Sequence, residues 1–79
     1  ITKEQKVLEI GSGCGPITGV LARKAKSVTC IDLSKMRSTI NAYRNRECDN
    51  VKIMVGNFQD VESSLTEKYD YIILPDRCV

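Results

Sequence analysis

The sequence has no histidine, and this absence removes two kinds of site from consideration. A zinc site of cysteine and histidine lacks half of its usual ligands, and the cysteines contain no C-x-x-C pair. A nucleophilic cysteine needs a neighbouring base, and the usual base is missing. We therefore expect no metal and no catalytic cysteine. We interpret the cysteines as small, buried or half-buried thiols of a cytoplasmic protein: Cys14, Cys30, Cys48 and Cys78.

Long apolar runs and a strong charge imbalance are also absent. No stretch approaches the roughly 20 apolar residues of a membrane span, and residues 1–6 are polar, unlike a signal peptide. The net charge of +2 is too small to indicate a nucleic-acid or membrane partner. The 79 residues suffice for one small domain. Because the chain begins with Ile1 and stops just after a strong strand pattern, we expect residues 1–79 to be a fragment of a longer protein.

The stretch Val7–Pro16 organises the chain. Its apolar start, interrupted only by Glu9, predicts a buried parallel strand that ends at a ligand. Gly11, Gly13 and Gly15 then permit a tight turn whose backbone comes close to a ligand. A helix from about residue 16 to 26 follows, with apolar residues on one face: Ile17, Val20, Leu21 and Ala25. Strand, glycine turn and helix form the first half of a nucleotide-binding βαβ unit.

The glycine spacing narrows the choice of nucleotide. In the dinucleotide fingerprint the third glycine is the sixth residue, where this chain has Pro16, and no G-K-S/T is present. An acidic residue two positions before G-x-G-x-G resembles motif I of the class I S-adenosylmethionine-dependent methyltransferases. The matching residues are Glu9, Gly11, Gly13 and Gly15. A glycine-rich turn without a ligand is the alternative.

This resemblance implies a role for each residue of the motif. The loop, including Ser12 and Cys14, passes under the methionine part of the cofactor, and Glu9 helps to hold the amino group of the cofactor. The chemistry is consistent, because S-adenosylmethionine has no pyrophosphate but carries an amino group and a sulfonium cation.

A second acidic residue ends the next predicted strand, Ser27–Asp32. Asp32 follows Gly11 by 21 residues, which is close to the spacing at which a carboxylate meets the ribose hydroxyls in nucleotide-binding βαβ folds. The resemblance implies the same role, and we include the adjacent Leu33 in the cofactor-binding set. A helix-capping or solvent-facing aspartate is the alternative.

A third signal follows the strand Val51–Val55, where the sequence reads Gly56-Asn57-Phe58. The resemblance implies that Asn57 binds the adenine amino group and that Phe58 lies against the ring. Asparagine replaces the commoner aspartate, but its amide oxygen still accepts a hydrogen bond. An ordinary turn also uses Gly-Asn, and a core position competes for Phe58.

The remaining patterns complete an alternation of strands and helices. Ser34 precedes a helix of about residues 35–46, whose apolar stripe is Met36, Ile40 and Tyr43 and whose basic face we interpret as solvated. A short helix over residues 61–67, capped by Asp60, precedes the strand Tyr69–Leu74. The sequence Leu74-Pro75-Asp76-Arg77 is not the N-P-P-Y or D-P-P-Y motif of some subfamilies, and we interpret Asp76 as a turn residue.

Together these patterns predict an α/β, Rossmann-like three-layer sandwich whose parallel four-stranded half-sheet has the order 3-2-1-4. The function implied by the resemblance is the S-adenosylmethionine-binding part of a methyltransferase with an unknown acceptor. No catalytic residue is assigned. Two alternatives stay open: a non-catalytic S-adenosylmethionine-binding or interaction module, and an NAD-binding half-domain. The apolar fourth strand is expected to form an exposed edge through which the chain self-associates.

Overall fold

The computed structural model describes residues 1–65 and 67–74 and shows four parallel strands with helices on both faces. The strand order is β3-β2-β1-β4, which confirms the predicted topology. In chain order the elements are β1 (Lys6–Ile10), α1 (Pro16–Lys24), β2 (Ser27–Asp32), α2 (Lys35–Arg44), β3 (Val51–Val55), α3 (Phe58–Val61), the 3-10 turn η1 (Glu62–Ser64) and β4 (Tyr71–Ile73).

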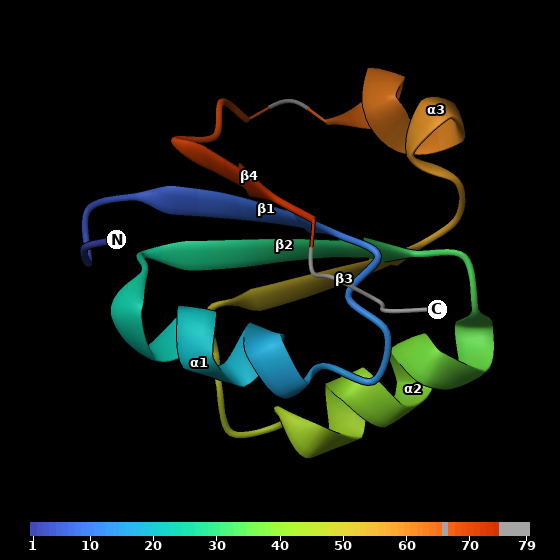
Figure 1. Cartoon of the computed structure of the whole chain (residues 1–79), viewed down its shortest axis with the longest axis horizontal. Coiled ribbons are helices and arrows are strands. Elements are labelled where there is room, and N and C mark those ends of the chain that lie inside the picture. Colours follow the sequence, from blue (N-terminus) through green and yellow to red (C-terminus); the bar gives the residue numbers. More distant parts are fainter. Residues whose placement is uncertain (66, 75–79) are drawn as a thin grey trace.

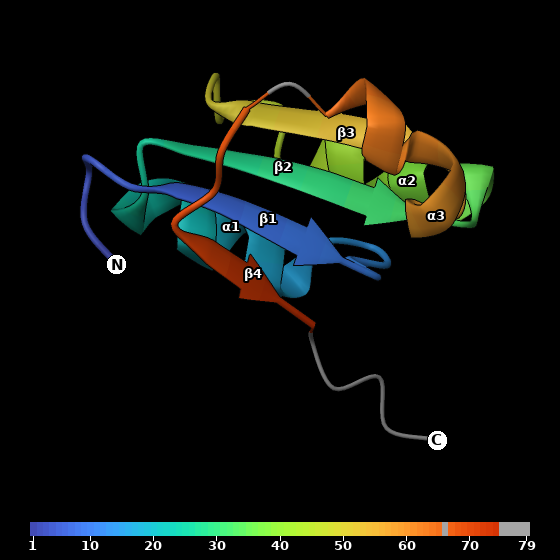
Figure 2. The same cartoon turned by 90° about the horizontal axis from the view of Figure 1, so that it is seen from above.

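The three layers follow from right-handed crossovers between parallel strands. Because β1, β2 and β3 are added in one direction, α1 and α2 cover one face of the sheet (Figure 1). The chain then returns to pair β4 with the other side of β1, and α3 lies on the opposite face (Figure 2). All the strands point the same way, so the carboxyl ends of β1, β2 and β3 meet at one edge.

The core lies between the sheet and α1. It consists of Val7, Leu21, Ala22, Ala25, Val28 and Cys30, all of them buried. Two residues of the predicted apolar face of α1, Ile17 and Val20, are instead exposed. The sheet therefore covers only part of the predicted apolar face of α1.

The strands β1, β2 and β3 have the predicted bounds, whereas the helices and β4 are shorter than predicted. Asn45 caps α2, so this helix ends at Arg44 instead of residue 46. The short helix begins at Phe58 instead of residue 61, because the Asn57 side chain accepts a hydrogen bond from Gln59 N at 2.9 Å. Asp70 belongs to the turn before β4, where its carboxylate accepts from Lys6 N at 2.8 Å. Pro75 and Asp76 lie outside the described residues.

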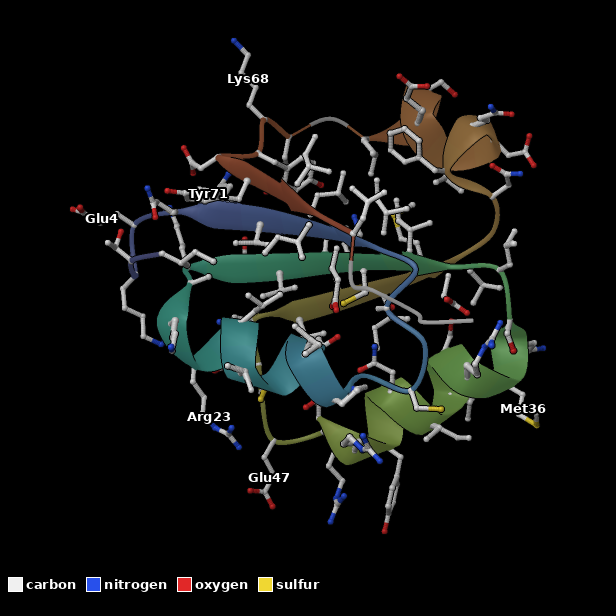
Figure 3. All side chains as sticks on the ribbon, in the orientation of Figure 1. Glu4, Arg23, Met36, Glu47, Lys68 and Tyr71 are labelled. Carbon is white, nitrogen blue, oxygen red and sulfur yellow. The ribbon has the colours of Figure 1, made fainter. Side chains whose placement is uncertain are left out.

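The orientation of α2 is the main departure from the sequence analysis. Its apolar stripe faces solvent: Met36 is 71%, Ile40 42% and Tyr43 69% exposed. Figure 3 shows Met36 pointing outward from the start of the helix. The buried face is polar, and Asn41 is fully buried. An amphipathic helix normally buries its apolar stripe, so a specific set of polar contacts must hold α2 in this orientation.

No helix in the described part of the chain is long and apolar enough to cross a membrane.

Candidate cofactor-binding site

The loop of residues 11–15, called the glycine loop below, connects β1 to α1. Gly11, Gly13 and Gly15 have φ values of 79°, 61° and 85°, a region that L side chains adopt at a cost. Hydrogen bonds tie the loop to β2. Gly11 N donates to Ile31 O at 2.7 Å, and Gly13 N donates to Asp32 Oδ1 at 3.1 Å. The three predicted glycines therefore give the loop a shape that follows the end of the neighbouring strand.

Asp32 is the residue on which the site converges. Its buried carboxylate accepts from Gly13 N through Oδ1, and from Ser34 N through Oδ2 at 3.0 Å. The Arg37 guanidinium lies beside the same carboxylate, with Nε 3.5 Å from Oδ2. Asp32 thus fixes both the glycine loop and the start of α2. Our alternative was a helix-capping or solvent-facing aspartate, but Asp32 is buried and the N-cap of α2 is Ser34. Asp32 also lines the pocket described next, so this structural role and the ribose-binding role are both compatible with its position.

A pocket of about 290 Å³ lies at the carboxyl ends of β1, β2 and β3. This volume is at the lower end of the roughly 300–1,000 Å³ typical of small-molecule sites. It brings together five of the residues singled out in the sequence, namely Gly11, Asp32, Leu33, Asn57 and Phe58. Four lining residues were not predicted: Ile10, Ile31, Arg37 and Gly56.

Arg37 is the unpredicted residue with the clearest chemistry. We expected the basic side chains of this helix to be solvated, yet Arg37 lines the pocket and pairs with Asp32. The sequence contained one signal for this position, because the N-cap residue Ser34 places Arg37 in the first turn of the helix after Asp32. In the structure Ser34 Oγ accepts a hydrogen bond from Arg37 N at 3.1 Å.

Asn57 and Phe58 enter the pocket from the loop after β3. Asn57 is exposed, and its Oδ1 accepts from Gln59 N, as in the ordinary turn that was our alternative. Phe58 is half-buried, so its ring belongs neither to the core nor fully to solvent. Both residues line the pocket, and an amide oxygen with two lone pairs can accept a second hydrogen bond.

The other predicted residues do not line the pocket, namely Glu9, Ser12, Gly13, Cys14 and Gly15. Glu9 is completely buried, with 0% exposure. Its Oε1 accepts hydrogen bonds from the Thr18 hydroxyl and, at 3.5 Å, from the Cys30 thiol. Glu9 therefore faces the layer between the sheet and α1.

Burial is the main cause of the pKa shifts of Glu9 and Cys30. It raises the pKa of Glu9, against the opposing effect of the hydrogen bonds from Thr18 and Cys30. Burial also raises the pKa of the Cys30 thiol to about 12, so Cys30 is protonated at neutral pH and is not a nucleophile. Glu9 Oε2 and Ser12 Oγ have no hydrogen-bond partner among residues 1–65 and 67–74. Such atoms are rare in proteins and need an explanation; Arg37 Nε and Ser38 Oγ are two more.

Comparison with known proteins identifies the family of the chain. A family model described as a methyltransferase domain matches residues 7–78. The chain belongs to this methyltransferase family. The class I resemblance found in the glycine motif is thereby confirmed.

Individual relatives show the extent of the similarity. The chain is 34% identical to the ribosomal RNA small subunit methyltransferase A of Listeria monocytogenes, over 100% of this chain and 28% of the relative. A dimethyladenosine transferase from Plasmodium falciparum superposes with a TM-score of 0.80 at 26% identity, over 95% of this chain and 27% of that one. A methyltransferase from Thiobacillus denitrificans, solved with S-adenosylhomocysteine, gives 0.77 at 26% identity, over 94% and 31%. This chain thus spans about a third or less of the length of each of these methyltransferases.

Proposed function

We propose that this chain forms the S-adenosylmethionine-binding part of a methyltransferase. The observation that carries the proposal is the pocket at the carboxyl ends of β1, β2 and β3. It gathers Gly11, Asp32 and Asn57, which are 21 and 25 residues apart in the sequence. In open α/β sheets, ligands bind at this edge.

The residues of the pocket fit the adenosine part of the cofactor. Leu33 and Phe58 provide apolar surface for the adenine ring, and Asn57 provides the amide that pairs with the edge of the ring. The Asp32 carboxylate, held in place from the glycine loop and α2, accepts hydrogen bonds from the ribose hydroxyls.

The glycine loop and Glu9 fit the methionine part. Glu9 Oε2 and Ser12 Oγ are buried acceptors without a partner among the described residues. An ammonium group is the donor that satisfies a buried carboxylate best. Because Glu9 is fully buried, the side chains that cover it must move before the amino group of the cofactor reaches Oε2.

The chain contributes binding and orientation to the reaction. When bound, S-adenosylmethionine supplies an electrophilic methyl group on a sulfonium. The pinned glycine loop, Asp32 and Asn57 hold the cofactor in one orientation at the edge of the sheet. Orientation of reactants is a large part of catalysis in transfers of this kind.

Calorimetric titration with S-adenosylhomocysteine, with NAD as the comparison ligand, tests the proposal. We expect selective binding of S-adenosylhomocysteine. Asp32→Asn should weaken it about tenfold or more, because charge-assisted hydrogen bonds contribute about 1.5–3 kcal/mol. Asp49→Asn, at an exposed turn outside the pocket, is the matched control and should change nothing. Tighter binding of NAD, or equal effects of the two substitutions, would refute the proposal.

A ribosomal RNA acceptor is a second, finer proposal, supported by the 34% identity to the Listeria rRNA methyltransferase across the whole chain. The test is transfer of a labelled methyl group by the full-length protein to small-subunit ribosomal RNA, beside a small-molecule amine. Label in the amine alone contradicts an RNA acceptor.

We also propose a cytoplasmic location, supported by free thiols at Cys14, Cys30 and Cys48 in the described part of the chain. Cell fractionation tests it, and recovery from an oxidising compartment contradicts it.

A further inference from the structure

The polar buried face of α2 requires an explanation. Asn41 and Asn45 are buried there, whereas the apolar stripe of the same helix faces solvent. A buried amide is costly unless it is hydrogen-bonded. The partners of these two side chains therefore indicate what the face is for.

The partners lie in the glycine loop and in α1. Asn45 Nδ2 donates to Gly15 O at 3.2 Å and to Asn41 Oδ1 at 2.7 Å. Asn41 Nδ2 donates to Thr18 Oγ1 at 3.3 Å. The Thr18 hydroxyl in turn donates to Glu9 Oε1. A continuous series of buried hydrogen bonds thus joins α2, the last glycine of the loop and the carboxyl group near the end of β1.

The two asparagines also occupy the space that two glycines leave open. A Cβ at Gly15 would lie 2.7 Å from Asn45 Nδ2 and even closer to Asn41 Oδ1. A Cβ at Gly19 would lie 2.5 Å from Asn45 Oδ1. Gly15 has a positive φ, but Gly19 is helical, so its lack of a side chain is explained by Asn45 alone. The contacts between α1 and the end of α2 therefore include the side-chain amides of Asn41 and Asn45.

We propose that Asn41 and Asn45 are positioning residues for the cofactor. Asn45 fixes the carbonyl at the end of the glycine loop, and Asn41 orients Glu9 through Thr18. This inference rests on the proposed function. A loop that already has its bound shape loses little conformational freedom on binding, so removal of the hold weakens affinity without removing any contact to the ligand.

Asn45→Ala and Asn50→Ala form a matched pair for the test. Asn50 also donates from Nδ2 to backbone carbonyls, but at the far end of α1, to Ala22 O at 2.8 Å and to Ala25 O at 3.3 Å. Both substitutions remove a side-chain amide that donates to a backbone carbonyl at an end of α1, because Gly15 is the N-cap of that helix. Only Asn45 reaches the glycine loop. Two readouts apply to each variant: amide hydrogen exchange at Gly13 and Gly15, and S-adenosylhomocysteine affinity.

We expect Asn45→Ala to speed exchange at the loop amides at least tenfold and to weaken S-adenosylhomocysteine binding roughly tenfold, which corresponds to one hydrogen bond. Asn50→Ala should lower the urea midpoint but leave both readouts unchanged. If Asn45→Ala does not fold, Asn45→Ser, which keeps a donor, should give a smaller change in the same direction.

Two outcomes overturn the inference: unchanged loop exchange in Asn45→Ala, or equal changes in Asn50→Ala, which would indicate general stability alone. The readouts also separate the two proposals. Suppose that the wild-type chain does not bind S-adenosylhomocysteine, but that exchange at the loop amides is faster in Asn45→Ala and unchanged in Asn50→Ala. The proposed function is then wrong, whereas the role of Asn45 in fixing the glycine loop is retained.

Discussion

The substitution Gly15→Ala probes the glycine loop most severely. Gly15 has a φ of 85°, where an alanine costs about 1–2 kcal/mol. The added Cβ would also meet Asn45 Nδ2 at 2.7 Å, and overpacking of this kind costs about 1–3 kcal/mol. The sum, about 2–5 kcal/mol, is a large part of the roughly 4–12 kcal/mol expected for a domain of 79 residues.

Urea unfolding followed by circular dichroism measures this loss. With a denaturant slope of about 1 kcal/mol per molar, the midpoint should fall by roughly 2 M or more. Gly19→Ala is the control, because its Cβ meets Asn45 Oδ1 at 2.5 Å without a positive φ. Alanine also gains up to about 1 kcal/mol of helix propensity there, so the loss should be smaller.

A double substitution separates the two costs at position 15. Asn41→Ala removes the side chain closest to the new Cβ, so Gly15→Ala should cost at least about 1 kcal/mol less in that background. A Gly15→Ala variant within about 1 kcal/mol of the wild type would refute the reasoning. So would a Gly19→Ala variant that is equally destabilised, because the backbone at Gly15 would then contribute nothing.

Three further predictions concern other parts of the molecule. Because burial raises the pKa of Glu9, the folded chain binds that proton more tightly than the unfolded chain does. The contribution of Glu9 to the free energy of unfolding is therefore present below the ordinary pKa of a glutamate and is lost as pH rises through the raised value. Urea unfolding between about pH 4 and pH 8 should show this fall in the wild type but a flatter profile in Glu9→Gln, and parallel profiles would contradict it. Met36→Lys should leave the free energy of unfolding within about 0.5 kcal/mol, because Met36 is 71% exposed, and a loss above about 2 kcal/mol in chemical denaturation would place Met36 in the core after all. Ile72 is exposed on the edge strand β4, so Ile72→Lys should lower the associated fraction in light scattering at high concentration; a wild-type chain that stays monodisperse would show that the edge does not associate.

Much of the fold could be predicted from local patterns. The strand order follows from the alternation of strands and helices and from the handedness of the crossovers. Gly11, Asp32, Asn57 and Phe58 could be grouped from the sequence alone, because parallel strands bring their carboxyl ends to one edge. Both inferences depend on which segments form strands and helices, and residues close in the sequence determine this.

Only the tertiary structure decided the orientation of α2, the burial of Glu9 and the place of Arg37 in the pocket. Periodicity shows that α2 has an apolar stripe, but it does not show which side of the helix is buried. That side is decided by hydrogen bonds between distant residues, such as Asn45 with Gly15, which are 30 positions apart. Burial of the hydrogen-bonded Asn41 and Asn45 amides outweighed burial of Met36 and Tyr43, because unpaired amides would cost more than exposing the stripe.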